Sequence, residues 1–158
     1  MSYLLQRLVP PQSTRVSLAL LLLRIVVGTG FIFHGMPKLA HPMSWDTATG
    51  PLPGVPGLLQ LLIVFAETFG GCCLILGFLT PLFAFIQTCD MIVVVFVVKI
   101  FGHALPYVGT KASGGASYEV EAHLLVGALA LLLCGPGIFS IDALLKKWFA
   151  HAKTSPAV

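Results

Sequence analysis

Charge is scarce in this sequence. Of its 158 residues only 9% are charged and 57% are hydrophobic, whereas a soluble domain carries roughly 25% charged residues. A soluble protein of this size could not bury so much apolar surface, but a lipid bilayer imposes no penalty on it. The formal net charge of +3 is small, and the basic residues lie mostly toward the two ends. The composition therefore predicts an integral membrane protein that contacts lipid and does not bind nucleic acid.

Motifs for catalysis and for cofactors are also missing. The sequence has no P-loop, no dinucleotide-binding glycine pattern, no G-x-S-x-G and no C-x-x-C-H haem site. It also has no C-x-x-C pair, so we interpret its cysteines as small packing residues rather than a redox dithiol. They are Cys72, Cys73, Cys89 and Cys134. No catalytic residue is assigned, and we do not expect this chain to catalyse a reaction alone.

Long apolar stretches, in contrast, are plentiful. A helix needs ~20 mostly apolar residues to cross a bilayer, and four stretches qualify, at residues 16–36, 57–79, 82–101 and 118–136. No small-residue cleavage site follows the first stretch, so we expect it to be retained. Residues 93–98 would indicate a strand in a soluble protein, but an isolated strand in lipid leaves backbone groups unpaired, which favours a helix. Residues 1–158 are therefore predicted to form one all-α membrane domain, a four-helix bundle.

Basic residues predict how this bundle is oriented. Five flank the spans on the side of the termini and three lie on the other side: Arg7, Arg15, Lys146, Lys147 and Lys153 against Lys38, Lys99 and Lys111. This asymmetry predicts that both termini are cytoplasmic. The proline-rich loop 37–56 and the Gly/Ser-rich loop 102–117 then lie outside. A short helix over residues 141–150, capped by Ser140, is expected at the membrane interface on the cytoplasmic side.

Ionisable residues inside the spans are costly in lipid, so they indicate a site. The rise per residue places Arg24 and Asp90 each ~12 Å in from the cytoplasmic side and Glu67 ~18 Å in, with Gln87 one turn below Asp90. We therefore predict a buried polar cluster of Arg24, Glu67, Asp90 and Gln87, in which Arg24 bridges to Glu67 or Asp90. The cluster could lock the bundle together, or it could form a binding site or a proton relay.

A second polar group is expected near the outer ends of the spans, formed by pairs of residues four apart that share a helix face. Its members are His34, Lys38, Lys99, His103, Glu119 and His123. Three interpretations stay open. The group could form interfacial hydrogen bonds and salt bridges, it could hydrogen-bond the carbonyls of a quinone, or it could bind a metal through His34, His103, His123 and Glu119. No compact ligand motif supports the metal.

Several segments resemble the DoxX family of membrane proteins. They are LRIVVG at residues 23–28, HGMPKL at 34–39, ETFGG at 67–71, LGFLTP at 76–81, YE at 118–119 and GPGIFSIDALL at 135–145. Their order and spacing cover roughly residues 18–145. Of the site residues named above, Arg24, Lys38 and Glu67 match positions that recur in the family pattern.

The resemblance implies a four-helix, multi-pass protein of the bacterial inner membrane. It also implies a quinone-linked subunit of a redox or stress-response complex that acts with a protein partner, because related proteins include a subunit of a thiosulfate:quinone oxidoreductase. Two alternatives stay open. The protein could be a non-enzymatic membrane anchor or assembly factor, or it could handle a small solute or a metal. The identity of the partner and the oligomeric state also stay open.

Overall fold

The computed structural model describes residues 13–46 and 54–154, with side chains described as far as residue 150. Arg7 and the side chain of Lys153, both used in the charge comparison, lie outside the described part, as do Pro51 and Pro53 of the proline-rich loop. The elements are, in order, α2 (Thr14–Gly35), the 3-10 helix η1 (Met36–Ala40), α3 (Gly57–Leu76), α4 (Thr80–Ile92), the π-helical η2 (Val93–Gly102), α5 (Glu119–Cys134) and α6 (Ile141–Thr154). All regular structure in the described residues is helical, which confirms the helix predicted at residues 93–98.

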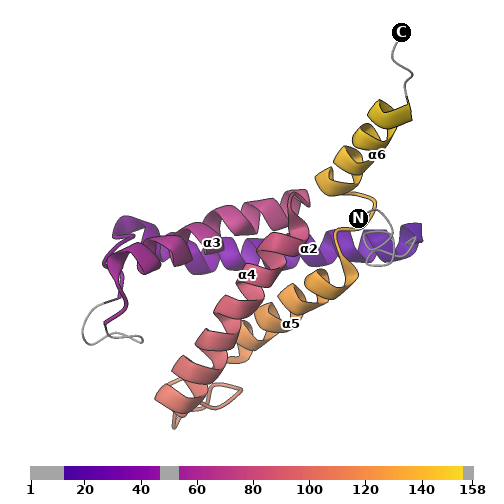
Figure 1. Ribbon diagram of the computed structural model, residues 1–158. Coiled ribbons are helices and arrows are strands. Elements are labelled where there is room, and N and C mark those ends of the chain that lie inside the picture. Colours follow the sequence, from indigo (N-terminus) through magenta and orange to yellow (C-terminus); the bar gives the residue numbers. More distant parts are fainter. Residues whose placement is uncertain (1–12, 47–53, 155–158) are drawn as a thin grey trace.

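Helices α2 and α3 form the first pair and lie side by side (Figure 1). Their backbones approach closely at two glycines. A Cβ added to Gly28 would lie 2.6 Å from the carbonyl oxygen of Gly71, and one added to Gly71 would lie 2.7 Å from the carbonyl oxygen of Gly28. Small residues at such a crossing let two membrane helices pack backbone against backbone. These two glycines therefore determine which levels of α2 and α3 face each other.

The second pair consists of α5 and the long rod formed by α4 and η2, and it crosses the first pair at an angle (Figure 1). A tight turn joins the two pairs. Gly77 ends α3 in the left-handed conformation, with φ 69°, and its amide donates to the carbonyl of Leu74 at 3.1 Å. A glycine in this conformation is a common way to end a helix. The chain is then free to start α4 only three residues later.

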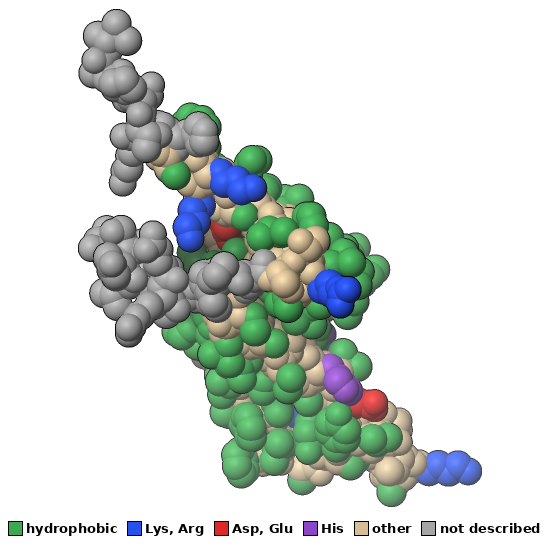
Figure 2. All heavy atoms as spheres, turned by 90° about the vertical axis from the view of Figure 1, so that its right-hand side faces the viewer, with side chains coloured by type: hydrophobic (Ala, Val, Ile, Leu, Met, Phe, Trp, Pro, Cys, Tyr) green, Lys and Arg blue, Asp and Glu red, His purple; other side chains and the backbone are tan. Residues whose placement is uncertain are grey.

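The core lies where the two pairs cross, and the outer faces of the helices are apolar as well. Fully buried core residues include Phe31, Leu74 and Met91. On the outer faces Val26 is 69% exposed and Leu133 72%. Figure 2 shows one face of the molecule, mostly covered by hydrophobic side chains, with the charged ones nearer its two ends. An apolar surface of this extent fits a protein surrounded by lipid.

Three helical segments in the described part of the chain are long and apolar enough to cross a membrane. They are Thr14–Ala40, Gly57–Leu76 and Thr80–Gly102. Helix α5 has 16 residues and is therefore only about 24 Å long at 1.5 Å per residue, compared with ~30 Å for the hydrocarbon core.

Helix α6 projects away from the crossed pairs (Figure 1). Its start is fixed by Ser140, whose Oγ accepts from the Ala143 amide at 3.1 Å and donates to the carbonyl of Gly137 at 2.7 Å, the N-terminal cap expected from the sequence. Two ends of the molecule can now be named. The terminal end comprises residues 77–80 and 135–140 with the start of α6, and the loop end comprises η1 and residues 103–118.

Candidate functional site

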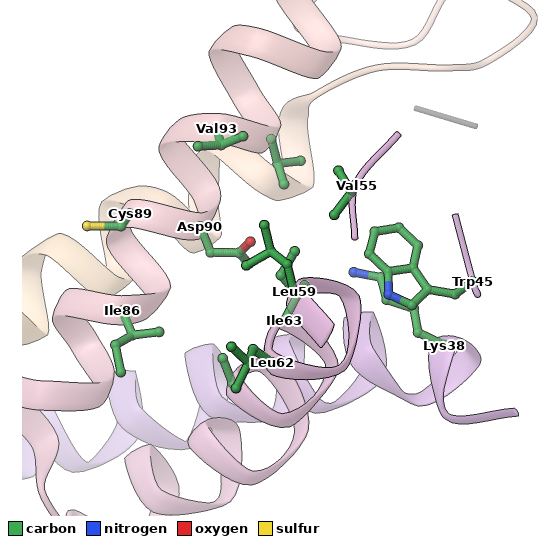
Figure 3. Close-up of a pocket in the computed structure, with 12 residues that line it drawn as sticks. Lys38, Trp45, Val55, Leu59, Leu62, Ile63, Ile86, Cys89, Asp90 and Val93 are labelled. Atoms are coloured by element: carbon green, nitrogen blue, oxygen red, sulfur yellow. The ribbon is translucent and has the colours of Figure 1, made fainter. Parts of the chain in front are cut away.

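A cavity of about 430 Å³ lies between α3, α4 and the segment that follows η1 (Figure 3). This volume falls within the ~300–1,000 Å³ of small-molecule sites. Most of the wall is apolar and comprises Leu59, Leu62, Ile63 and Ala66 of α3, Ile86 and Cys89 of α4, Val93 and Val94 of η2, and Trp45 and Val55. Two charged side chains, Lys38 and Asp90, complete it. Leu62 and Val93 are 54% and 41% exposed, so the wall continues onto the outer apolar surface.

Lys38 is held in place from two directions. It lies in η1, the tight turn that begins at Met36 and directs the chain from α2 toward α3. Its Nζ donates to both carboxylate oxygens of Glu67 at 2.6 Å, and Glu67 is fully buried. The same Nζ lies 4.6 Å from the centre of the Trp45 ring, where a cation is attracted to the π face. An ammonium has three N–H groups, so one remains for a ligand.

The buried amide side chain of Gln60 attaches the wall that contains Trp45 and Val55 to α3. Gln60 Oε1 accepts from the Asp46 amide at 3.0 Å, and its Nε2 donates to the carbonyls of Asp46 at 3.2 Å and Val55 at 3.0 Å. The Gln60 carbonyl accepts from the Trp45 indole at 3.2 Å. The sequence-based analysis missed Gln60 and Trp45. The available signal was an amide side chain inside the otherwise apolar start of the 57–79 stretch.

Asp90 and Gln87 reach the same region from α4. The Asp90 carboxylate points toward the α3 side of the cavity (Figure 3). Its Oδ2 is buried and has no hydrogen-bond partner within the part of the chain that the structure describes, and the same is true of Gln87 Oε1. The Gln87 Nε2 donates to the Ala66 carbonyl at 2.8 Å. Because buried polar atoms are normally paired, an unpaired carboxylate oxygen beside a cavity indicates a place for a ligand or a water molecule.

Arg24 does not join this group, so the predicted bridge from Arg24 to Glu67 or Asp90 is wrong. Arg24 is fully buried, but its Nη1 donates to the carbonyl of Ile75 at 3.4 Å and its Nη2 to the carbonyl of Phe139. Glu67 has Lys38 as its cation instead.

Helix register explains this error. Gly28 faces Gly71, and Gly35 faces Glu67 and Thr68. Arg24, eleven residues before Gly35, is therefore about 16 Å away along α2 from the level of Glu67. The depth estimate assumed that the spans begin level with one another. In the structure, the start of α2 extends past the end of α3, where residues 135–139 run beside it.

Arg24 belongs to a separate polar site at the terminal end, centred on Asp142. The Asp142 carboxylate accepts from the amides of Leu79 and Thr80, each at 2.8 Å, and so caps the N-terminus of α4. The Asp142 amide donates to the Gly77 carbonyl at 2.9 Å, and its carboxylate interacts electrostatically with Arg24. Sequence reasoning missed Asp142, although an acidic residue two positions after the predicted Ser140 cap was a usable signal.

The outer polar group divides into two parts. Lys99 Nζ lies 3.0 Å from Glu121 Oε1 and donates to the Ser117 carbonyl at 3.4 Å. Glu121, which the sequence-based grouping left out, is buried, with 7% of its surface exposed. His34 is half-buried and interacts electrostatically with this pair and with the Lys38–Glu67 pair.

The remaining members lie at the surface. His103 is exposed. His123 Nδ1 lies 2.7 Å from the backbone oxygen of Glu119, and its Nε2 lies 3.4 Å from the Tyr107 hydroxyl. Within the described residues, no three His, Cys, Asp or Glu side chains come close enough to hold a metal ion. The structure therefore does not bring the four proposed metal ligands together. None of the four cysteines forms a disulfide within the described residues.

Long apolar helices, buried ion pairs and a cavity that opens onto the apolar surface define a multi-pass helical membrane protein with an internal polar site. The DoxX family model matches residues 19–100. The chain is also 31% identical to the inner membrane protein YqjF of Escherichia coli (strain K12) over 124 residues, which are 72% of this chain and 88% of that protein. The chain therefore belongs to the DoxX family and is an inner-membrane protein. No solved structure matches it.

Proposed function

We propose that this protein is the quinone-binding membrane subunit of a redox complex and acts with a protein partner. One observation carries the proposal, namely that an apolar cavity contains a fixed ammonium and an unpaired carboxylate oxygen (Figure 3). A quinone has an apolar ring and two carbonyl oxygens. Lys38 would donate to one carbonyl, and Asp90 would accept from a hydroxyl of the reduced form.

The position of the cavity suits a ligand that arrives from the bilayer. Leu59, Leu62 and Val93 at its rim are 48%, 54% and 41% exposed, so an isoprenoid tail could extend from the ring into lipid without crossing a polar surface. Lipid-phase entry also explains why the wall is apolar apart from Lys38 and Asp90.

The proposed topology has four crossings, with α5 as the short fourth span and both termini in the cytoplasm. The orientation is supported by the excess of basic residues on the terminal side in the sequence, where Arg7, Arg15, Lys146, Lys147 and Lys153 stand against Lys38, Lys99 and Lys111. A reporter that works only in the cytoplasm should be active when it is fused after Val158. A reporter that works only in the periplasm should be active when it is inserted beside Lys111. The reverse pattern would contradict the orientation.

The first test is quinone content. Protein extracted in a mild detergent should retain more quinone per chain, by mass spectrometry, than an unrelated four-span protein. Asp90→Asn should lower this value to the control level, because the amide lacks the charge and one acceptor site. Asp142→Asn, the same substitution at the terminal end, should leave it unchanged. Quinone at the control level in the wild type would contradict the proposal.

A second test uses the two tryptophans. A Trp148→Phe variant leaves Trp45 at the cavity as the only tryptophan, and Trp45→Phe leaves Trp148 on α6. Titration with a short-tailed quinone in nanodiscs should quench Trp45 saturably at about one quinone per chain. Trp148 should show only the linear quenching expected of quinone dissolved in lipid. Linear quenching of both tryptophans would exclude a specific site at the cavity.

The second candidate is a membrane anchor or assembly factor, and the geometry of α6 favours it. This helix projects away from the other helices (Figure 1) and exposes Lys146 and Lys147 together with Trp148. If quinone stays at the control level, but a protein co-purifies with the wild type and is lost from a Lys146→Glu/Lys147→Glu variant, the anchoring role is supported instead.

A further inference from the structure

A row of ionisable side chains extends from the cavity to the loop end of the protein. It begins at Asp90 and continues through the Lys38–Glu67 pair, His34 and the Glu121–Lys99 pair, ending where Lys99 contacts the Ser117 carbonyl. The two ion pairs have N–O distances of 2.6 Å and 3.0 Å. Asp90 interacts electrostatically with Glu67 and Lys38. The row thus reaches from a buried carboxylate to a side chain at the surface.

His34 is the member that connects the two ion pairs. It interacts electrostatically with Lys38 of η1 and Glu67 of α3, and with Lys99 of η2 and Glu121 of α5. Within residues 13–46 and 54–150 no group hydrogen-bonds its ring, so both ring nitrogens can bind water. An imidazole can accept a proton at one nitrogen and release one from the other, which makes histidine a common proton shuttle.

The row is more extensive than a structural lock requires. One ion pair between neighbouring segments would join them, and each further buried ionisable group carries a cost in lipid. Six elements contribute one member each, namely α2, η1, α3, α4, η2 and α5. Only the complete fold therefore brings the members of this row together.

Among the described residues, the terminal end has no comparable route. There Arg24 donates to two backbone carbonyls, and Asp142 accepts from the amides at the start of α4. A guanidinium does not release its proton in a protein, and backbone groups do not titrate. Arg24 therefore does not relay a proton at this end, and its hydrogen bonds stabilise the packing.

We infer that protons reach the cavity from the loop end alone, through Glu121, His34 and the Lys38–Glu67 pair, with water molecules across the gaps. The use of this route rests on the proposed function. Reduction of a quinone to its quinol takes two electrons, supplied by a redox centre of the partner protein, and two protons, which this row delivers to the two ring oxygens. Oxidation of the quinol releases the two protons along the same row.

The test needs no quinone, so its result can be interpreted even if the protein proves not to bind quinone. The full chain is reconstituted into vesicles with different pH values inside and outside. A hydrophobic carbodiimide, which reacts with protonated buried carboxyl groups, is added, and its adduct on Asp90 is quantified by mass spectrometry. Trypsin added outside cuts at Lys111 only in molecules whose loop end faces outward, which identifies the orientation of each population.

Modification of Asp90 should rise several-fold when the loop side is acidified and should not respond to the terminal side. His34→Gln should abolish this response, while His103→Gln, the same change at an exposed position, should preserve it. Should His34→Gln fail to fold, Glu121→Gln should give the same loss. A response to the terminal side, an equal response to both sides, a normal response in His34→Gln, or the same loss in His103→Gln would each overturn the inference.

Discussion

Replacing Lys38 by methionine should destabilise the protein strongly, because the change leaves a fully buried carboxylate without its cation. Both oxygens of Glu67 lie 2.6 Å from Lys38 Nζ, and Glu67 exposes 0% of its side chain. At this separation and an effective dielectric constant of ~20, the Coulomb attraction is about 6 kcal/mol. Desolvation of the two ions offsets part of it, and removal of one partner of such a pair typically costs about 3–5 kcal/mol.

We also expect stability to recover when both members of the pair are replaced. A Lys38→Met/Glu67→Met double variant removes both charges and fills the space with apolar side chains, so its free energy of unfolding should return to within about 2 kcal/mol of the wild type. Unfolding would be followed by circular dichroism during titration with SDS in mixed micelles. The coupling energy between the two positions follows from the four proteins of the double-mutant cycle.

Lys99→Met provides the matched control. The Lys99–Glu121 pair is more accessible, with side chains 26% and 10% exposed compared with 18% and 0% for Lys38 and Glu67. Lys99→Met should therefore cost clearly less. Equal losses in Lys38→Met and Lys99→Met, or a double variant as unstable as Lys38→Met, would refute the account of the buried pair.

Three further predictions concern packing, capping and metal. Gly28→Ala should reduce the free energy of unfolding by about 1–3 kcal/mol, because its new Cβ would lie 2.6 Å from a backbone oxygen. In Gly30→Ala the new Cβ would meet only the end of the Leu124 side chain, so this variant should cost less. Equal losses in the two variants would contradict the close approach of α2 and α3. Asp142→Ala should cost about 0.5–2 kcal/mol in the same SDS titration through loss of the cap on α4, and an unchanged midpoint would show that water replaces the carboxylate. Protein purified without chelator should contain far less than one transition metal per chain by elemental analysis, and a stoichiometric metal lost on His123→Ala would revive the metal interpretation.

Sequence alone was sufficient for the membrane class, the family and the approximate position of each helix, because a long apolar run has few structural solutions in a bilayer. It was also sufficient to single out Glu67, Gln87 and Asp90. Each lies on the inward face of a long helix, where an ionisable or amide side chain stands out against apolar neighbours.

The partners of these residues could not be predicted in the same way. Lys38 reaches Glu67 because the tight turn η1 begins at Met36, immediately after α2, and folds over α3. Arg24 misses Glu67 because the contact between Gly28 and Gly71 sets the register of α2 and α3. Both outcomes depend on how elements slide and cross, and periodicity within a single helix carries no information about either.

The partners of Arg24 also impose an order on assembly. Arg24 enters the membrane early in synthesis, but its acceptor at Ile75 is made 51 residues later and that at Phe139 115 residues later. At ~5–20 residues per second, the second acceptor follows Arg24 by roughly 6–23 s. During that interval the first helix contains a charged group whose final environment does not yet exist. The hydrogen bonds of Arg24 at the terminal end can therefore all form only after nearly the whole chain has been synthesised. A chain interrupted before residue 139 would leave this arginine without its acceptor at Phe139 and exposed to quality control.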